Sequence, residues 1–260
     1  MPEIDISPAS LHRKLRTKFI GQNILYYPVT SSTMDMAKQV IRDGAEEGTI
    51  VIADRQTAGR GRLGRKWLSP PDSSILLSII LYPKLDELLR LNMAACLAVA
   101  QSIEKATGLE PTIKWPNDVL IKGKKVSGIL IESDFQGGSV SYAIVGIALN
   151  VNLDPSSIPE ISETATSLKE VLGQEVSRLE ILRCLLGEFE ELYRALRRGE
   201  PIDREWRRRL ETLGKEVTVR CGEDVREGYA ESVDEDGNLL LRCPDGSLVT
   251  IAAGDVTLKA

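Results

Sequence analysis

The first 213 residues alternate short apolar runs with longer segments in which apolar residues recur every three or four positions. Short runs rich in β-branched residues are typical of strands, and the longer spacing is typical of helices. The run 74–82 is almost wholly apolar and predicts a central strand, because neighbours must cover both of its faces. The other strands predicted in this part are 24–27, 49–52, 112–115, 119–121, 126–133 and 141–152.

The helical spacing occurs in six segments. The longest has an Ala-rich face and stops before Gly108, a residue type common at helix ends. Ser7 followed by Pro8 predicts the start of the first helix. A Ser side chain can accept a hydrogen bond from a free amide of the first turn, and Pro lacks the backbone N–H that would stay unpaired at that position. Ser32 or Thr33 would cap the second helix in the same way. The predicted helices are 8–18, 34–43, 85–107, 165–172, 177–196 and 201–213.

The pattern changes after residue 213, where turn-forming Gly, Asp and Asn separate short alternating runs. We therefore predict a small all-β barrel in 214–260, following a larger domain in 1–213. The barrel segment holds five basic and ten acidic residues, which accounts for the net charge of −5. An acidic chain of this kind is not suited to general nucleic-acid binding. The predicted barrel strands are 216–220, 225–233, 238–242 and 248–252.

Composition argues against several further classes of function. The four cysteines form no C-x-x-C pair and lie far from the single histidine, His12, so we expect reduced, buried cytoplasmic thiols and no zinc site. His12 lies in a polar helical stretch, which argues against a Ser-His-Asp or Cys-His nucleophile. No secretory signal is evident, and no apolar run is long enough to cross a membrane.

The segment 53–67 follows an apolar strand, and within it residues 59–66 combine three glycines with four cations. Glycine is costly to order and neighbouring cations repel, so the segment should be mobile when empty. Glycine also lets backbone amides approach a ligand, and arginine forks match phosphate or carboxylate. The segment is therefore either a loop that closes over a polyanion or a solvated flexible loop. The residues concerned are Gly59, Arg60, Gly61, Arg62, Gly64, Arg65 and Lys66.

Three motifs stand out in the sequence. Residues 59–67 read Gly-Arg-Gly-Arg-Leu-Gly-Arg-Lys-Trp, 114–118 read Lys-Trp-Pro-Asn-Asp, and 125–132 read Lys-Val-Ser-Gly-Ile-Leu-Ile-Glu. These motifs resemble those of the biotin protein ligase family. The three follow one another in the family's order, and the resemblance is close over 31–152. The chain is similar to the short form of the family, because the residues before Leu25 are too few for the N-terminal DNA-binding domain. No sequence-specific DNA binding is expected.

The resemblance implies an α+β fold with two domains. The catalytic domain, 1–213, should be similar to class II aminoacyl-tRNA synthetases, with a mixed, largely antiparallel sheet and helices against one face. The domain 214–260 should be an SH3-like barrel. A homodimer is compatible with the resemblance.

The implied activity is an ATP-dependent ligase that forms biotinyl-5'-AMP and transfers biotin to a lysine of a biotin carboxyl carrier protein domain. Mg²⁺ is the expected metal. Two alternatives remain: a lipoate or octanoate ligase-type transferase on a similar scaffold, and a non-catalytic biotin- or nucleotide-binding module. The Ser-Thr pair and the complete cationic loop favour biotin over a plain acyl chain.

The resemblance also implies site residues. Family members often have Asp-Ser-Thr-Asn where this chain has Ser31 and Met34 at the outer places. The implied catalytic residues are Lys125 and Arg60. Biotin is expected against Ser32, Thr33, Gln56, Gly59, Arg60, Arg62, Lys125, Gly128 and Gly146. ATP is expected against Arg62, Arg65, Trp67, Lys114, Asn117 and Asn150, and Mg²⁺ against Asp118.

Overall fold

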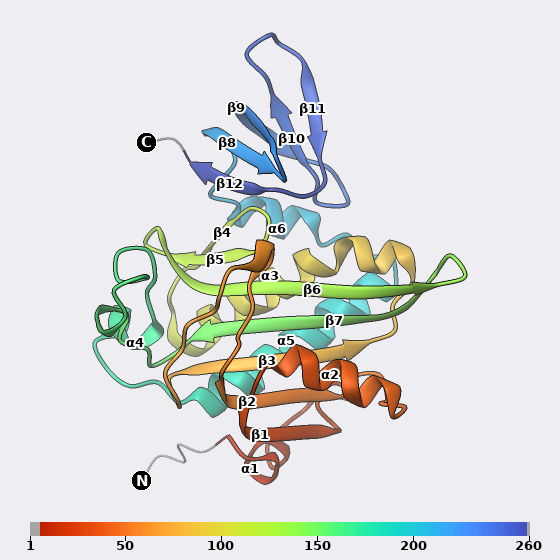
Figure 1. The fold of residues 1–260 in the computed structure, drawn as a ribbon, viewed down its shortest axis with the longest axis vertical. Helices are drawn as coiled ribbons and strands as arrows, with labels where there is room; N and C mark the ends of the chain where they lie inside the picture. The colour runs from red at the N-terminus through yellow and green to blue at the C-terminus, as the bar shows by residue number, and fades with distance from the viewer. Residues whose placement is uncertain (1–5, 259–260) are drawn as a thin grey trace.

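The computed structural model describes residues 6–258, which form a large sheet with helices and a smaller sheet above it (Figure 1). The large sheet has seven strands in the order β1-β2-β3-β7-β6-β5-β4. Only β1 and β2 run parallel among these neighbours, so the prediction of a mixed, largely antiparallel sheet is confirmed. The strands are β1 (Ile24–Thr30), β2 (Ile50–Gln56), β3 (Ser74–Leu81), β4 (Thr112–Lys114), β5 (Asp118–Ile121), β6 (Lys124–Gln136) and β7 (Ser139–Asn150).

Helices cover both faces of this sheet, so the expectation of helices against one face is wrong. α3 (Leu85–Thr107) and α5 (Arg178–Arg197) pack behind the sheet in Figure 1, and α2 (Thr33–Arg42) lies in front. The reason is the alternation of side chains along a strand. In β3, which is buried throughout as predicted, Ile79 joins the core of α3 and α5, whereas Ile80 joins a second cluster under α2.

The first helix is shorter than predicted. α1 spans Pro8–His12, with Ser7 as its cap, whereas the sequence pattern suggested a helix to residue 18. At the end of the predicted range, Glu190 of α5 provides an acceptor that competes with helical hydrogen bonding. Its carboxylate accepts backbone N–H bonds from Lys18 at 2.7 Å and from Phe19 and Ile20 at 2.9 Å. His12 is exposed, as expected.

We expect Glu190→Gln to lower the free energy of unfolding by about 1–3 kcal/mol, because the amide NH₂ cannot accept the bonds that one carboxylate oxygen now receives. Urea titration would measure this loss. Glu191→Gln is the matched control, since the Glu191 side chain is exposed and pairs only with Arg194 among the ion pairs of the described residues. Equal stability of the two variants would show that the hydrogen bonds accepted by Glu190 do not stabilise the fold.

Two later helices are also shorter than predicted, because residues at their predicted ends form backbone hydrogen bonds with strands instead. The backbone of Thr166 donates to the Lys125 carbonyl at 2.8 Å, so α4 is confined to Leu168–Leu172. The Glu211 amide donates to the Ile113 carbonyl at 2.8 Å, beside β4, so α6 ends at Arg209. Here α6 spans Asp203–Arg209. Local helical spacing does not reveal either of these tertiary contacts.

The smaller sheet is antiparallel throughout, in the order β11-β10-β9-β8-β12. Its last strand, β12, is only four residues long and was missed in the sequence. The core continues between the two sheets, since the Trp115 indole nitrogen donates to the Gly237 carbonyl at 2.9 Å. The strands are β8 (Glu216–Cys221), β9 (Asp224–Val233), β10 (Leu239–Arg242), β11 (Leu248–Ile251) and β12 (Asp255–Leu258).

The cysteines are all free thiols, as predicted. Cys96 is fully buried, and burial raises the pKa of its thiol well above the usual range. Cys184, Cys221 and Cys243 are only half-buried, so the expectation of buried cysteines holds for Cys96 alone. Among the described residues, no helix is both long enough and apolar enough to cross a membrane.

Candidate active site

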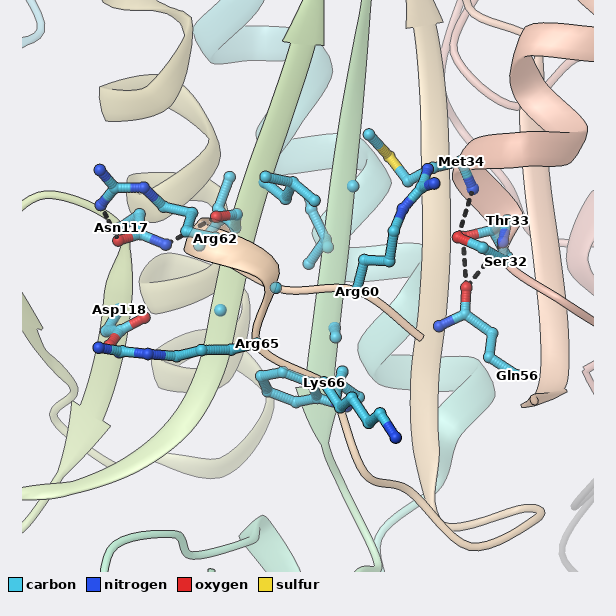
Figure 2. Close-up of a pocket in the computed structure, with 18 of the residues that line it drawn as sticks. Ser32, Thr33, Met34, Gln56, Arg60, Arg62, Arg65, Lys66, Asn117 and Asp118 are labelled. Atoms are coloured by element: carbon cyan, nitrogen blue, oxygen red, sulfur yellow. Dashed lines mark hydrogen bonds between the residues drawn. The ribbon is translucent and has the colours of Figure 1, made fainter. Parts of the chain in front are cut away.

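A cavity lies on the face of the large sheet that carries α2, beneath the loop that joins β2 to β3 (Figure 2). Its walls come from the start of α2, from that loop, from β5, β6 and β7, and from Asp255 of the small sheet. The structure thereby brings together most of the residues singled out from the sequence. Those that line the cavity are Ser32, Thr33, Gln56, Arg60, Arg62, Arg65, Trp67, Asn117, Asp118, Lys125, Gly128 and Gly146.

One end of the cavity presents uncharged hydrogen-bonding groups from Ser32, Thr33 and Gln56, with Arg60 on the same side (Figure 2). Ser32 caps α2 by accepting the Met34 N–H at 3.3 Å, so this hydroxyl has the capping role considered for it. Thr33 donates its backbone N–H to Gln56 Oε1 at 2.7 Å, and its hydroxyl lies 3.0 Å from the same oxygen. A buried Ser78 hydroxyl stands 2.8 Å behind Thr33 Oγ1. This end offers fixed donors and acceptors to a small polar ring.

The opposite end of the cavity is cationic (Figure 2). Lys125 Nζ lies 2.6 Å from Asp118 Oδ1 and 5.4 Å from the centre of the Trp67 ring. Gly128 makes this approach possible, because a β-carbon there would lie 3.0 Å from the Trp67 ring and 3.1 Å from Lys125 Nζ. The ammonium group is therefore held in place at the cavity wall by a carboxylate and an aromatic face.

Arg62 and Arg65 reach the same end from the loop. Arg62 Nη1 donates to Asn117 Oδ1 at 2.9 Å, and Asn117 in turn donates to the Ile129 carbonyl at 2.8 Å. Burial lowers the pKa of the Arg62 guanidinium, while Asp255 and Asp118 oppose that shift. Arg65 forms an ion pair with Asp255 of β12. A partly desolvated guanidinium is suited to an incoming anion.

The loop itself is folded over the cavity. The Gly61 amide donates to the Arg65 carbonyl at 2.7 Å and the Trp67 amide to the Gly59 carbonyl at 3.0 Å. A short 3₁₀ turn at Arg62–Gly64 forms its tip. As the composition predicted, the loop is irregular apart from this turn, and its mobility in the absence of ligand stays a prediction.

Arg60 and Gly59 both make contacts within the protein, and their expected roles towards the ligands stay predictions. Arg60 lines the cavity, but its guanidinium pairs with Asp35 of α2 at 2.8 Å and with Glu132 of β6 at 3.4 Å. Gly59 does not line this cavity. A β-carbon on Gly59 would lie 2.9 Å from the Trp67 carbonyl, so glycine is needed there for close packing of the loop.

Two residues expected at ATP also lie outside the cavity lining. Lys114 ends β4 at the edge of the sheet. Asn150 is buried, where its amide donates to the Thr166 carbonyl at 3.1 Å and its oxygen accepts from Ser74 at 3.4 Å. In this structure the Asn150 side chain is held by these two hydrogen bonds, and its contact with ATP stays a prediction.

Sequence reasoning missed several lining residues. Asp255 comes from β12, 190 positions after Arg65, and no local pattern connects the two. Met34 was noted only as a departure from the family, yet its sulfur packs directly over Gly146. The apolar strand residues Leu77, Ile129, Leu130, Ile147 and Ala148 also line the cavity, as do Gly61, Leu63 and Lys66 of the loop. The periodicity of the strand residues was visible, but not which of them would face the cavity.

The donor set gives limited support for a metal. The described residues contain no group of three or more His, Cys, Asp or Glu that could hold an ion. Asp118 and Asp255 are the carboxylates of the cavity lining, and each is paired with a cation. This set does not suit a metal held by protein ligands alone, but Mg²⁺ commonly binds through one or two carboxylates together with substrate phosphates.

The mixed sheet, the smaller sheet and the cavity are consistent with the family that comparison with known proteins identifies. Residues 26–150 match the model of the biotin/lipoate A/B protein ligase family, and residues 212–259 match that of the biotin protein ligase C-terminal domain. The chain belongs to the biotin protein ligase family, as its motifs indicated, with the family's α+β catalytic fold and SH3-like C-terminal sheet.

Relatives and solved structures agree with this assignment. The bifunctional ligase/repressor BirA of Bacillus subtilis is 37% identical over 258 residues, which cover 97% of this chain and 79% of that protein. The biotin--[acetyl-CoA-carboxylase] ligase of Mycobacterium tuberculosis is 32% identical over 266 residues, covering 96% of each. The structure of biotin protein ligase from Aquifex aeolicus in complex with biotin and ATP superposes with a TM-score of 0.78 and 33% identity, covering 92% of this chain and 99% of that one.

Proposed function

We infer that this protein is an enzyme that activates biotin with ATP as biotinyl-5'-AMP and transfers the biotin to a lysine of a biotin carboxyl carrier protein domain. The observation that carries this inference is the polarity of one cavity. It has hydrogen-bonding groups at Thr33 and Gln56 at one end and the cations Lys125 and Arg62 at the other. Biotin has the same polarity, with a ureido ring at one end and a carboxylate at the other.

In the first step a biotin carboxylate oxygen forms a bond to the α-phosphorus of ATP while the bond to pyrophosphate breaks. Two anions must approach each other, so the reaction depends on preorganised positive charge. Lys125 and Arg62 supply it from fixed positions, since Asp118 and Asn117 hold them. Trp67 covers the same end and helps to exclude water from the anhydride product.

In the second step the neutral amine of the acceptor lysine attacks the carbonyl carbon of the anhydride. An amide bond forms, the bond to AMP breaks, and the amine releases a proton. Asp118 is the residue proposed to meet Mg²⁺, which when bound with ATP would neutralise phosphate charge. Gln56, Gly128 and Gly146 are proposed to contact biotin, and Arg65 the phosphates.

We also propose the finer assignments that accompany this function. The domains are divided at residue 213/214, which is supported by the separate pairing of β8 to β12. A cytoplasmic location is supported by the free thiols. Absence of sequence-specific DNA recognition is supported by the net charge of −5. A homodimer stays compatible with these features.

The transfer step can be tested with a purified carrier domain as acceptor. We expect covalent biotin on one lysine of that domain, detected by mass spectrometry, when the enzyme, biotin, ATP and Mg²⁺ are all present. A carrier domain with that lysine changed to Arg should remain unmodified, since Arg is not a nucleophile near neutral pH. Adenylate formation without any transfer to the carrier would contradict the proposed acceptor.

A further inference from the structure

Arg178, which no step of the proposed reaction uses, connects the two ends of the cavity loop. It is the first residue of α5 and its side chain is only 4% exposed. Its Nη1 lies 3.2 Å from Asp54 Oδ1 and 3.3 Å from the Ser74 carbonyl, and its Nη2 lies 3.0 Å from Asp72 Oδ1. Asp54 lies near the end of β2, Ser74 is the first residue of β3, and Asp72 lies two residues before that strand.

These contacts occur where the pairing of the two strands stops. The last β2–β3 pair is Ala53 with Leu76, and the chain between them contains the whole cationic loop. Beyond that pair, the guanidinium of Arg178 binds both ends of the loop. Each end also has its own backbone anchor, because the Thr57 amide donates to the Thr30 carbonyl and the Asn152 amide to the Ser73 carbonyl.

The location of Arg178 is electrostatically unfavourable except for these contacts. A cation at the N-terminus of a helix opposes the helix dipole, and a buried guanidinium must regain the hydrogen bonds that it loses to water. Asp72 is also held at φ 59, a left-handed conformation that costs most residues free energy. The carboxylates of Asp54 and Asp72 compensate for the burial and the position of the guanidinium. The ion pair with Arg178 in turn helps to hold Asp72 in its left-handed conformation.

We propose that Arg178 is a positioning residue for the loop, holding its two ends together so that Arg62, Arg65 and Trp67 lie over the cavity. The proposal rests on the proposed function for its kinetic consequence. Weaker holding lowers the fraction of molecules with the loop closed before ligand binds. The apparent affinity for biotin then falls in proportion to the fraction of molecules whose loop is closed, while the rate at saturating biotin changes little.

Limited proteolysis of the ligand-free protein tests the proposal without any activity. Trypsin can cut after Arg60, Arg62, Arg65 and Lys66, and cutting requires an opened chain. Arg178→Lys keeps the charge but cannot bind both ends. We expect it to speed cleavage in the loop about tenfold relative to cleavage at Arg208, because it loses charge-assisted bonds. Asp72→Asn keeps the size and tolerates the left-handed φ, and should give about a threefold effect.

Arg183→Lys is the matched control. Arg183 lies on the same helix, and its guanidinium binds the Ser10 carbonyl, far from the loop in sequence. The loop cleavage ratio, which is the rate of cleavage in the loop divided by the rate at Arg208, should therefore stay at the wild-type value. In kinetic assays, Arg178→Lys should raise the KM for biotin about five- to tenfold with kcat within twofold of wild type.

An unchanged loop cleavage ratio in Asp72→Asn and in folded Arg178→Lys would overturn the proposal. So would an equal acceleration at every site, since that reports general unfolding. If Arg178→Lys does not fold, Asp72→Asn decides alone. Faster loop cleavage in these variants, together with no biotin-dependent turnover by the wild type, would leave the positioning role intact and refute the proposed function.

Discussion

Lys125→Ala is expected to slow biotinyl-adenylate formation by on the order of 10²–10³-fold, the range for loss of one preorganised charge-stabilising donor. Its ammonium is fixed 2.6 Å from Asp118 and over Trp67, at the end of the cavity where the proposed reaction would join carboxylate and α-phosphate. Pyrophosphate release with saturating biotin and ATP would measure the loss. Folding should persist, because the side chain is partly exposed and contributes little to the core.

The control for Lys125 is its neighbour Lys124. Its side chain is exposed at the β5–β6 turn and does not line the cavity, so Lys124→Ala should keep wild-type rates. Comparison of the two variants shows whether the rate depends on the lysine at the cavity wall or on any positive charge near the site. Near-wild-type adenylation by Lys125→Ala would remove this lysine from the chemistry.

Gly146→Val is expected to weaken biotin binding by on the order of 10²-fold, because overpacking a filled site costs roughly 1–3 kcal/mol. A β-carbon at Gly146 would lie 2.7 Å from the Met34 sulfur and 3.2 Å from the Leu130 carbonyl. Met34 can shift, but the Leu130 carbonyl belongs to the paired backbone of β6. The added methyl groups would therefore occupy space in the cavity. Titration calorimetry with biotin would give the change in Kd.

Gly187→Val provides the comparison for added bulk, since a β-carbon there meets no atom within 4 Å beyond its chain neighbours and the adjacent backbone of its own helix. We expect this variant of α5 to bind biotin with the affinity of the wild type. Thermal melting of both variants would show whether the loss at Gly146 reflects the cavity or general unfolding. An unchanged Kd in folded Gly146→Val would place biotin elsewhere.

Local patterns predicted most of the elements. The helix at Leu85–Thr107 has the predicted bounds, because a long Ala-rich face is followed by Gly108 in the left-handed conformation that ends helices. The uniform apolar run of β3 correctly indicated a central strand. The failures came from contacts distant in sequence, such as Glu190 accepting the backbone N–H of Lys18 at the predicted end of the first helix.

The site was predictable to a similar extent. The three motifs identified most of the residues that line the cavity, because they lie on the loop and on adjacent strands. They did not identify Asp255 or Arg178, since each reaches the loop from a separate part of the chain. The wider resemblance placed Asn150 at ATP, which stays a prediction, and in this structure its side chain bonds Thr166 and Ser74. Side-chain direction at a strand end depends on neighbours that a motif does not specify.

The central claim is that this cavity activates biotin. Pyrophosphate release from ATP, measured separately with biotin, lipoate and octanoate, tests it most directly. The fixed polar groups at Thr33 and Gln56 would be left unpaired by a plain acyl chain. We therefore predict a kcat/KM for biotin at least about 10²-fold above that for either alternative acid. Equal or faster turnover with lipoate or octanoate, or no turnover with any of the three, would contradict the claim.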